Sequence, residues 1–149
     1  MINCIRTNSD NTDFQKLVEE LDAELRIIDG EDHLFYAQFN KTDMIKHVIV
    51  AYEDKVAVGC GAVRRYSETT TEVKRMYVPK NRRGEGIASQ ILGELETWAK
   101  ELHYEKCILE TGNKQMEALH LYNKNGYRRI GNFGKYQRVE NSVCFEKVL

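Results

Sequence analysis

The chain has 149 residues, of which 42% are hydrophobic and 30% charged, and its formal net charge at pH 7 is −1. A chain of this length can bury a core of its own, so we expect one domain over residues 1–149. The balanced charge argues against a nucleic-acid platform and against a polybasic membrane anchor. No apolar run approaches the roughly 20 residues of a membrane span, and the first residues lack a signal-peptide pattern. We therefore expect a cytoplasmic protein that binds neither nucleic acid nor membrane.

The hydrophobic pattern of the first half predicts one helix and four strands. Residues 12–28 repeat apolar side chains at helical spacing, and Gly30 ends the helix that they predict. The expected strands cover residues 1–6, 47–52, 56–66 and 70–78, with a hairpin turn at residues 53–55. Gly59 and Gly61 inside the third strand indicate a bulge or close packing. Residues 31–42 are compatible with irregular structure or a short helix.

The second half predicts two helices and three strands. The helices cover residues 84–102 and 115–125, and the strands cover residues 106–110, 127–130 and 142–148. Antiparallel hairpins therefore come first and a β-α-β crossover comes later. This order predicts an α/β (α+β) fold with a mixed, mostly antiparallel central sheet of about seven strands and helices on both faces.

The cysteines and histidines show no spacing typical of a metal site. The cysteines fall singly in strand-like segments, without a Cys-x-x-Cys pair: Cys4, Cys60, Cys107 and Cys144. This setting favours buried, reduced thiols. The four histidines also lack ligand spacing, so we expect no metal.

A basic loop followed by two glycines predicts a phosphate site. Pro79 ends the strand over residues 70–78, and the loop 80–83 contains one lysine and two arginines. Gly84 and Gly86 then lead into a helix, whose N-terminus exposes unpaired N–H groups and the positive end of the helix dipole. Glycine also lets a ligand approach the backbone closely. The alternative is an ordinary tight turn with a solvated basic loop.

Residues 83–88, Arg-Gly-Glu-Gly-Ile-Ala, fit the pattern Q/R-x-x-G-x-G/A. They resemble the acetyl-CoA pyrophosphate loop of the GNAT superfamily of N-acetyltransferases. Residues 115–127 resemble a second stretch of that family, N-x-x-A-x-x-L-Y-x-x-x-G-F, and they match it at Ala118, Leu121, Tyr122 and Gly126. The two motifs have the spacing and order of the family.

The second motif departs from the family pattern at one contact position. Gln115 stands where an asparagine often contacts the pantetheine arm, and Asn113 is the alternative for that contact. The resemblance is good from about Val48 to Leu149 and weak before, where acceptor specificity is usually built. The closing residues 127–147 resemble a bacterial subgroup of unassigned substrate.

The resemblance implies a GNAT fold that binds acetyl-CoA as acyl donor. The acceptor would be a primary amine of a small molecule or peptide. GNAT proteins are often dimers, but the sequence does not decide whether this chain forms a homodimer. The residues that the resemblance places against the coenzyme are Met76, Tyr77, Val78, Arg83, Gly84, Glu85, Gly86, Ile87, Ala88, Ser89, Asn113, Gln115 and Tyr122.

Two side chains are the candidate acid and base. Glu72 aligns with a position that carries the base in some members, and strand alternation places Glu72, Lys74, Met76 and Val78 on one face. Its alternative role is a solvent-exposed strand carboxylate, paired with Lys74 or Arg65. Tyr122 is the candidate acid, because a phenol can protonate a departing thiolate; its alternative role is a buried core tyrosine. The backbone N–H of Met76 is the candidate oxyanion donor.

The sequence says least about the residues that would bind the acceptor. Aromatic candidates are Phe35, Tyr36, Phe39 and the loop 133–136, with plain core packing as the alternative for most of them. A non-catalytic acyl-CoA-binding module of the same fold is a competing function. So is a dinucleotide-binding domain, because Gly84-x-Gly86 is followed by an acidic residue, Glu110, at a compatible distance.

Overall fold

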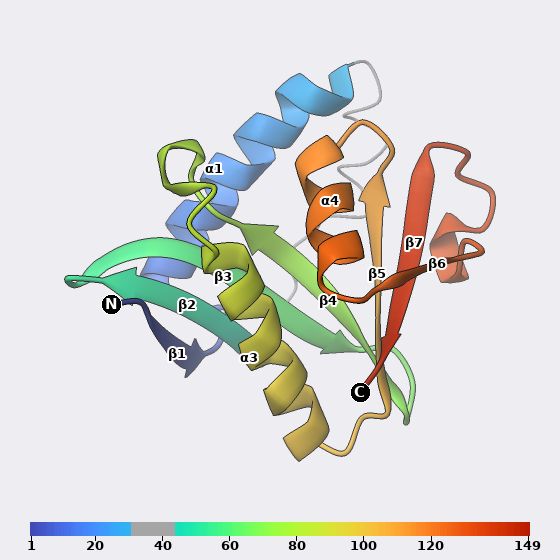
Figure 1. Cartoon of the computed structure of the whole chain (residues 1–149), viewed down its shortest axis with the longest axis horizontal. Coiled ribbons are helices and arrows are strands. Elements are labelled where there is room, and N and C mark those ends of the chain that lie inside the picture. The colour runs from blue at the N-terminus through green and yellow to red at the C-terminus, as the bar shows by residue number, and fades with distance from the viewer. Residues whose placement is uncertain (31–43) are drawn as a thin grey trace.

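The computed structural model describes residues 1–30 and 44–149 (Figure 1). Its elements are β1 (Asn3–Thr7), α1 (Thr12–Asp29), β2 (His47–Glu53), β3 (Val56–Arg65), β4 (Thr70–Tyr77), the 3-10 helix η2 (Lys80–Arg82), α3 (Ile87–Glu101), β5 (Lys106–Gly112), α4 (Met116–Lys124), β6 (Arg128–Ile130), the 3-10 helix η3 (Gly134–Tyr136) and β7 (Ser142–Val148). They confirm the expected elements with small differences at their ends. The ambiguous segment 31–42, with the candidates Phe35, Tyr36 and Phe39, lies outside the described residues.

The seven strands form one mixed sheet with helices on both faces, as expected. Its strand order is β1-β2-β3-β4-β5-β7-β6, and every neighbouring pair is antiparallel except β4 and β5. Helix α1 packs on one face, which we call the α1 face, against Val48, Val50, Cys60 and Ala62. Helices α3 and α4 cover the other face, which we call the α3 face (Figure 1).

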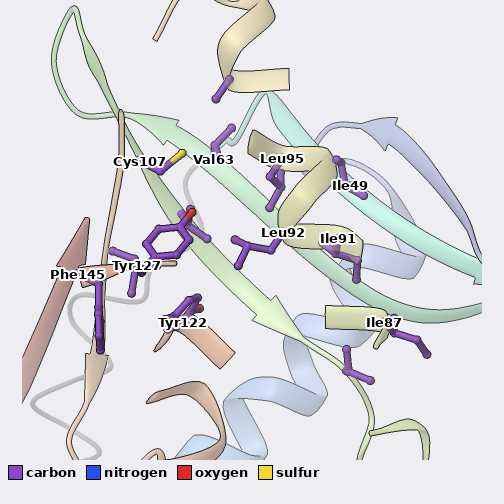
Figure 2. Packing of buried hydrophobic residues seen from close by; sticks show 14 of the residues in the cluster. Ile49, Val63, Ile87, Ile91, Leu92, Leu95, Cys107, Tyr122, Tyr127 and Phe145 are labelled. Atoms are coloured by element: carbon purple, nitrogen blue, oxygen red, sulfur yellow. The ribbon is translucent and has the colours of Figure 1, made fainter. Parts of the chain in front are cut away.

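The core on the α3 face is the larger of the two. Ile91, Leu92 and Leu95 of α3 are fully buried, and they lie over the sheet beside aromatic residues of α4, β7 and the segment between them (Figure 2). The amphipathic pattern of α3 supplies this apolar stripe. Full burial of one such side chain contributes about 1.5–3 kcal/mol, so this helix is held firmly against the sheet.

Two glycines of β3 allow α3 to approach the sheet closely. A Cβ at Gly59 would lie 2.8 Å from Cδ1 of Ile91. A Cβ at Gly61 would lie 2.4 Å from Sδ of Met76 and 3.0 Å from side-chain carbons of Ile91 and Leu95. The close packing that these glycines indicate is therefore present.

A bulge in β4 overturns one expectation about its faces. Cys60 pairs with Tyr77 and Ala62 pairs with Lys74, so two residues of β4 oppose Gly61 alone. One of them, Arg75, has φ 58°. The extra residue reverses the alternation. The prediction that Glu72, Lys74, Met76 and Val78 share one face is therefore wrong: the first two belong to the α1 face, and the last two pack into the core on the α3 face.

Candidate active site

The sheet opens between its two parallel strands. β4 and β5 pair only where Thr70–Glu72 meets residues 106–108, although both strands continue beyond this point. Beyond it the strands diverge, and α4 lies next to the opening (Figure 1). The backbone edge of β4 that faces β5 after Glu72 therefore has no strand partner there, which leaves polar backbone groups for a ligand.

A pocket of about 90 Å³ occupies this opening. Its walls come from both faces of the sheet and from α1, α4 and η3: Leu21, Leu25, Glu72, Val73, Lys74, Arg75, Met76, Glu110, Thr111, Gly112, Gln115, Ala118, Tyr122 and Tyr136. Met76, Ala118 and Tyr122 belong to the core on the α3 face. Glu72 and Lys74 approach from the α1 face, so the pocket connects the two sides of the sheet.

The predicted phosphate loop has the geometry of an anion site. Gly84 and Gly86 both have φ 82°, a left-handed conformation that favours glycine. Gly86 caps α3, and no side chain caps the first turn of the helix. The first N–H groups of α3, at Ile87, Ala88 and Ser89, are therefore available to a phosphate.

The Arg83 side chain is engaged within the protein. Its Nε donates to the Val78 carbonyl oxygen at 2.8 Å, and its two terminal nitrogens pair with Glu24 of α1 at 2.6 Å and Glu117 of α4 at 2.7 Å. These ion pairs raise the pKa of the guanidinium further. In this structure Arg83 links the two helices beside the pocket, and its side chain does not point freely toward a phosphate.

The neighbouring candidates of the loop are also partnered. Arg82 pairs with Glu53 at 2.7 Å and with Glu85 at 3.1 Å. The contact with Arg82 lowers the pKa of the Glu85 carboxyl. The Ser89 hydroxyl accepts a hydrogen bond from Nδ2 of Asn125 at 3.1 Å. The backbone, and not these side chains, is thus the part of the loop that is most open to a ligand.

Only one of the two pantetheine candidates lines the pocket. Gln115 does so, and its Oε1 accepts a hydrogen bond from the Thr111 hydroxyl at 3.0 Å. Asn113 is exposed, and its backbone N–H donates to the Asn141 carbonyl. Tyr77 packs toward α1, whereas Met76 and Val78 pack into the core on the α3 face.

Tyr122 lies where the pocket meets the core. Its side chain is 6% exposed, and its ring packs against Tyr127 and Phe145 at centroid distances of 5.7 Å and 6.0 Å (Figure 2). Burial, and then the nearby charge of Glu110, raises the pKa of the phenol well above its ordinary value. Tyr122 therefore stays protonated at neutral pH, although the same burial makes it a weaker acid than an exposed phenol.

Glu72 reaches the pocket as an ion-paired carboxylate. Its side chain is 12% exposed, and its Oε2 lies 3.5 Å from Nζ of Lys74. The pairing with Lys74 that the alternative role of Glu72 predicts is therefore present, but the expected exposure to solvent is wrong, because the residue is buried at the pocket.

Glu110 is a second pocket carboxylate that the motif analysis did not place at the site. The Ser142 hydroxyl of β7 donates to its Oε2 at 2.6 Å, and burial raises the pKa of the carboxyl. One sequence signal could have found it. Cys107 and Leu109 of β5 point into the core, so Ile108 and Glu110 share the α1 face, toward which Glu72 also projects.

Tyr136 of η3 closes the pocket on the α1 face. It is 2% exposed, and burial and the nearby charges of Glu72 and Glu110 raise the pKa of its phenol. The structure thus brings one aromatic residue of the candidate loop 133–136 to the site. Phe133 packs edge-on against the ring of Tyr136, with a distance of 5.5 Å between the ring centroids.

Two further properties concern cofactors and membranes. Among the described residues, no three acidic, histidine or cysteine side chains gather closely enough to hold a metal ion. Within the same residues, no helix is both long and apolar enough to cross a bilayer.

Comparisons with known proteins identify the family. The acetyltransferase (GNAT) family matches residues 14–127. IAA acetyltransferase of Azospirillum brasilense is 35% identical over 138 residues, which cover 90% of this chain and 89% of that protein. A Klebsiella pneumoniae protein assigned as an acyl-CoA N-acyltransferase has a crystal structure that superposes with a TM-score of 0.84 at 29% identity, over 100% of this chain and 98% of that one.

A third comparison is with a structure that contains acetyl-CoA. The structure of a GNAT family acetyltransferase from Elizabethkingia anophelis with acetyl-CoA bound has a TM-score of 0.69 at 22% identity, over 99% of this chain and 98% of that one. At this identity the likeness shows the fold alone. Together with the family match over most of the chain, these findings show that the protein belongs to the GNAT family of acetyltransferases.

Proposed function

We propose that this protein transfers an acetyl group from acetyl-CoA to a primary amine of a small molecule or peptide. The observation that carries the proposal is the opening between β4 and β5, which joins the two faces of the sheet beside the phosphate loop. A thioester that enters along the α3 face meets there an amine that enters from the α1 face. The acetyl-CoA complex of the Elizabethkingia protein, which has the same fold, supports acetyl-CoA as the donor.

The coenzyme would bind mainly through backbone groups. The first N–H groups of α3, behind Gly84 and Gly86, suit the pyrophosphate. The pantetheine arm would follow the unpaired edge of β4 past Met76 and the side chain of Gln115. A backbone N–H of this edge, at or next to Met76, is our candidate donor to the oxyanion that forms on the acetyl carbonyl.

Two side chains would move the protons. An alkylamine has a pKa of about 10.4, so it must lose a proton before it attacks. Glu110 is better suited than Glu72 to accept this proton, because burial raises its pKa while Glu72 is already paired with Lys74. Tyr122, which stays protonated, would give a proton to the departing thiolate.

The competing functions have less support. A non-catalytic acyl-CoA-binding module needs no carboxylate and phenol together in its pocket, whereas Glu110 and Tyr122 both line this one. A dinucleotide-binding domain would use its acidic residue on a ribose hydroxyl. Glu110 is instead half-buried and accepts a hydrogen bond from Ser142, and the sheet is mostly antiparallel.

The first test is the shift in melting temperature with acetyl-CoA, coenzyme A, NAD and ATP at matched concentration. A ligand at 100 times its dissociation constant adds about 2.7 kcal/mol to the free energy of unfolding, which gives a clear shift. We expect shifts with the two coenzyme A species alone, followed by thiol release when an amine is added. A shift with NAD or ATP alone would contradict the proposal.

A matched pair of variants tests the role of Tyr122. Tyr122→Phe should lower kcat with little effect on acetyl-CoA binding, because only the phenol hydroxyl is removed. Tyr127→Phe is the control: this ring packs on Tyr122, but its hydroxyl donates to Glu96, which does not line the pocket. Equal turnover in both variants would remove Tyr122 from the mechanism.

A further inference from the structure

One primary amine of the protein itself lies in the candidate site. Lys74 of β4 lines the pocket, and among the described residues it is the only lysine that does so. Its side chain is 11% exposed, and its Nζ lies 3.5 Å from Oε2 of Glu72. A lysine in this position is shielded from reagents in solution. It shares a cavity, however, with the groups that we expect to carry out acetyl transfer.

Those groups line the same pocket from three elements. Glu110 of β5 is the candidate base, Tyr122 of α4 is the candidate acid, and Met76 of β4 marks the candidate oxyanion donor. The pocket lies where β4 and β5 have parted, so it is open to both faces of the sheet. The sheet therefore does not separate the side chain of Lys74, on the α1 face, from a thioester on the α3 face.

The reach of the lysine matches the distance to the expected acetyl position. Lys74 and Met76 are two residues apart, and two residues of extended chain span at most about 7 Å. The flexible four-carbon stem of a lysine covers a distance of this order. Glu72 holds Nζ by a single contact at 3.5 Å, so rotation about the side-chain bonds of Lys74 is enough to release it.

We propose that the protein acetylates its own Lys74 on Nζ when acetyl-CoA is bound and no other amine occupies the pocket. The inference rests on the proposed acetyltransferase function and adds an internal acceptor to it. Acetylation removes the charge of Nζ, so Glu72 would lose this ion-pair partner. The added acetyl group would also take up room in a pocket of about 90 Å³.

The chemistry is balanced with the groups present. The ammonium of Lys74 first loses one proton to water, and the neutral nitrogen then attacks the acetyl carbon of acetyl-CoA. Glu110 takes the second proton as the N–C bond forms. The C–S bond breaks, and Tyr122 gives its proton to the thiolate. The products are Lys74 with an acetamide on its stem and free coenzyme A, and proton exchange with water restores Glu110 and Tyr122.

Peptide mass spectrometry after incubation with acetyl-CoA alone provides the test. We expect Lys74 to be acetylated at least about tenfold faster than Lys16, an exposed lysine of α1 that does not line the pocket, because positioned groups react faster than groups that meet by diffusion. Acetyl phosphate, which donates an acetyl group without a coenzyme, is the control reagent. It should modify Lys16 faster than Lys74, because Lys74 is shielded.

Three controls link the modification to the pocket. Free coenzyme A should compete with acetyl-CoA for the site, so it should slow acetylation at Lys74 more than at Lys16. The rate constant at Lys74 should stay the same when the protein is diluted, because the reaction takes place within one molecule. Lys74→Arg keeps a positive charge beside Glu72, but its guanidinium does not lose a proton, so the fast acetylation should disappear.

The outcomes separate this inference from the proposed function. Equal rates at Lys74 and Lys16, a rate at Lys74 that coenzyme A does not slow, or fast acetylation that persists in Lys74→Arg would overturn the inference. Thiol release with added spermidine, leucinamide or tyramine would in that case still support an amine acetyltransferase. If acetyl-CoA binds but neither Lys74 nor an added amine is acetylated, the proposed function fails, and this inference fails with it.

Discussion

Replacing Glu110 by glutamine tests the assignment of the base. The amide keeps the shape of the carboxyl and an oxygen that can accept the hydrogen bond from Ser142, now 2.6 Å long. The pocket should therefore keep its form, and the KM for acetyl-CoA should change little. What is lost is the ability to take a proton.

The expected magnitude follows from the acceptor. An alkylamine of pKa about 10.4 is neutral in roughly one molecule in 2,500 at pH 7, so removal of its protons limits the reaction. A positioned base usually contributes about 10²- to 10⁴-fold. We therefore expect Glu110→Gln to lower kcat/KM by about a hundredfold or more, and the matched change Glu72→Gln to lower it by less than about tenfold.

The pH profile gives the sign of the effect. Glu110 acts as a base only when it is deprotonated, and burial raises its pKa, so kcat/KM should rise with pH through that raised value. Glu110→Gln should lose this limb of the profile and keep only the dependence that the amine itself imposes. Activity within about threefold of the parent at every pH, or a larger loss in Glu72→Gln, would refute the reasoning.

Substitutions at three glycines give further predictions. Gly61→Ala places a Cβ 2.4 Å from Sδ of Met76, and it should lower the free energy of unfolding in urea by about 1–3 kcal/mol. Gly93→Ala, in the middle of α3 with no atom within 4 Å of the new Cβ, is its control and should be neutral or stabilising. Gly86→Ala forces an L-residue to φ 82° at the cap of α3, which should lower the free energy of unfolding by about 1–2 kcal/mol. It should also weaken acetyl-CoA binding, measured by calorimetry. Unchanged affinity would contradict the backbone phosphate site.

The elements of the fold are predictable because their signals are local. The apolar repeat of α1 and the glycines of the phosphate loop can be read within a few residues. The reversal of side-chain alternation in β4 cannot be read from neighbouring residues, because nothing in the identity of Arg75 indicates its φ of 58°. The only hint was Gly61 on the neighbouring strand, which the bulge faces.

Part of the candidate site could be predicted because its residues also belong to local patterns. Gly86 and Tyr122 belong to short motifs, so the sequence places them without knowledge of the fold. Glu110 becomes a pocket residue only when β5 and β7 come together, since its partner Ser142 follows it by 32 residues. Such long-range contacts leave no trace in local spacing.

The bulge also has a consequence for the order of the reaction. Within three residues of β4, the side chains change from the α1 face at Lys74 to the α3 face at Met76, and the strand has already parted from β5. One strand can thus hold the acceptor on one face and the thioester on the other at the same time. This arrangement favours direct transfer in a complex of both substrates.

The cysteines support direct transfer over an acetylated-enzyme route. Burial raises the pKa of Cys60 and of Cys107 to about 12, so almost no nucleophilic thiolate forms at neutral pH. Burial also raises the pKa of Cys4 and Cys144. Double-reciprocal plots with both substrates varied should therefore give intersecting lines. Parallel lines, with an acetylated cysteine found by mass spectrometry after incubation with acetyl-CoA alone, would show instead that the acetyl group passes through the protein.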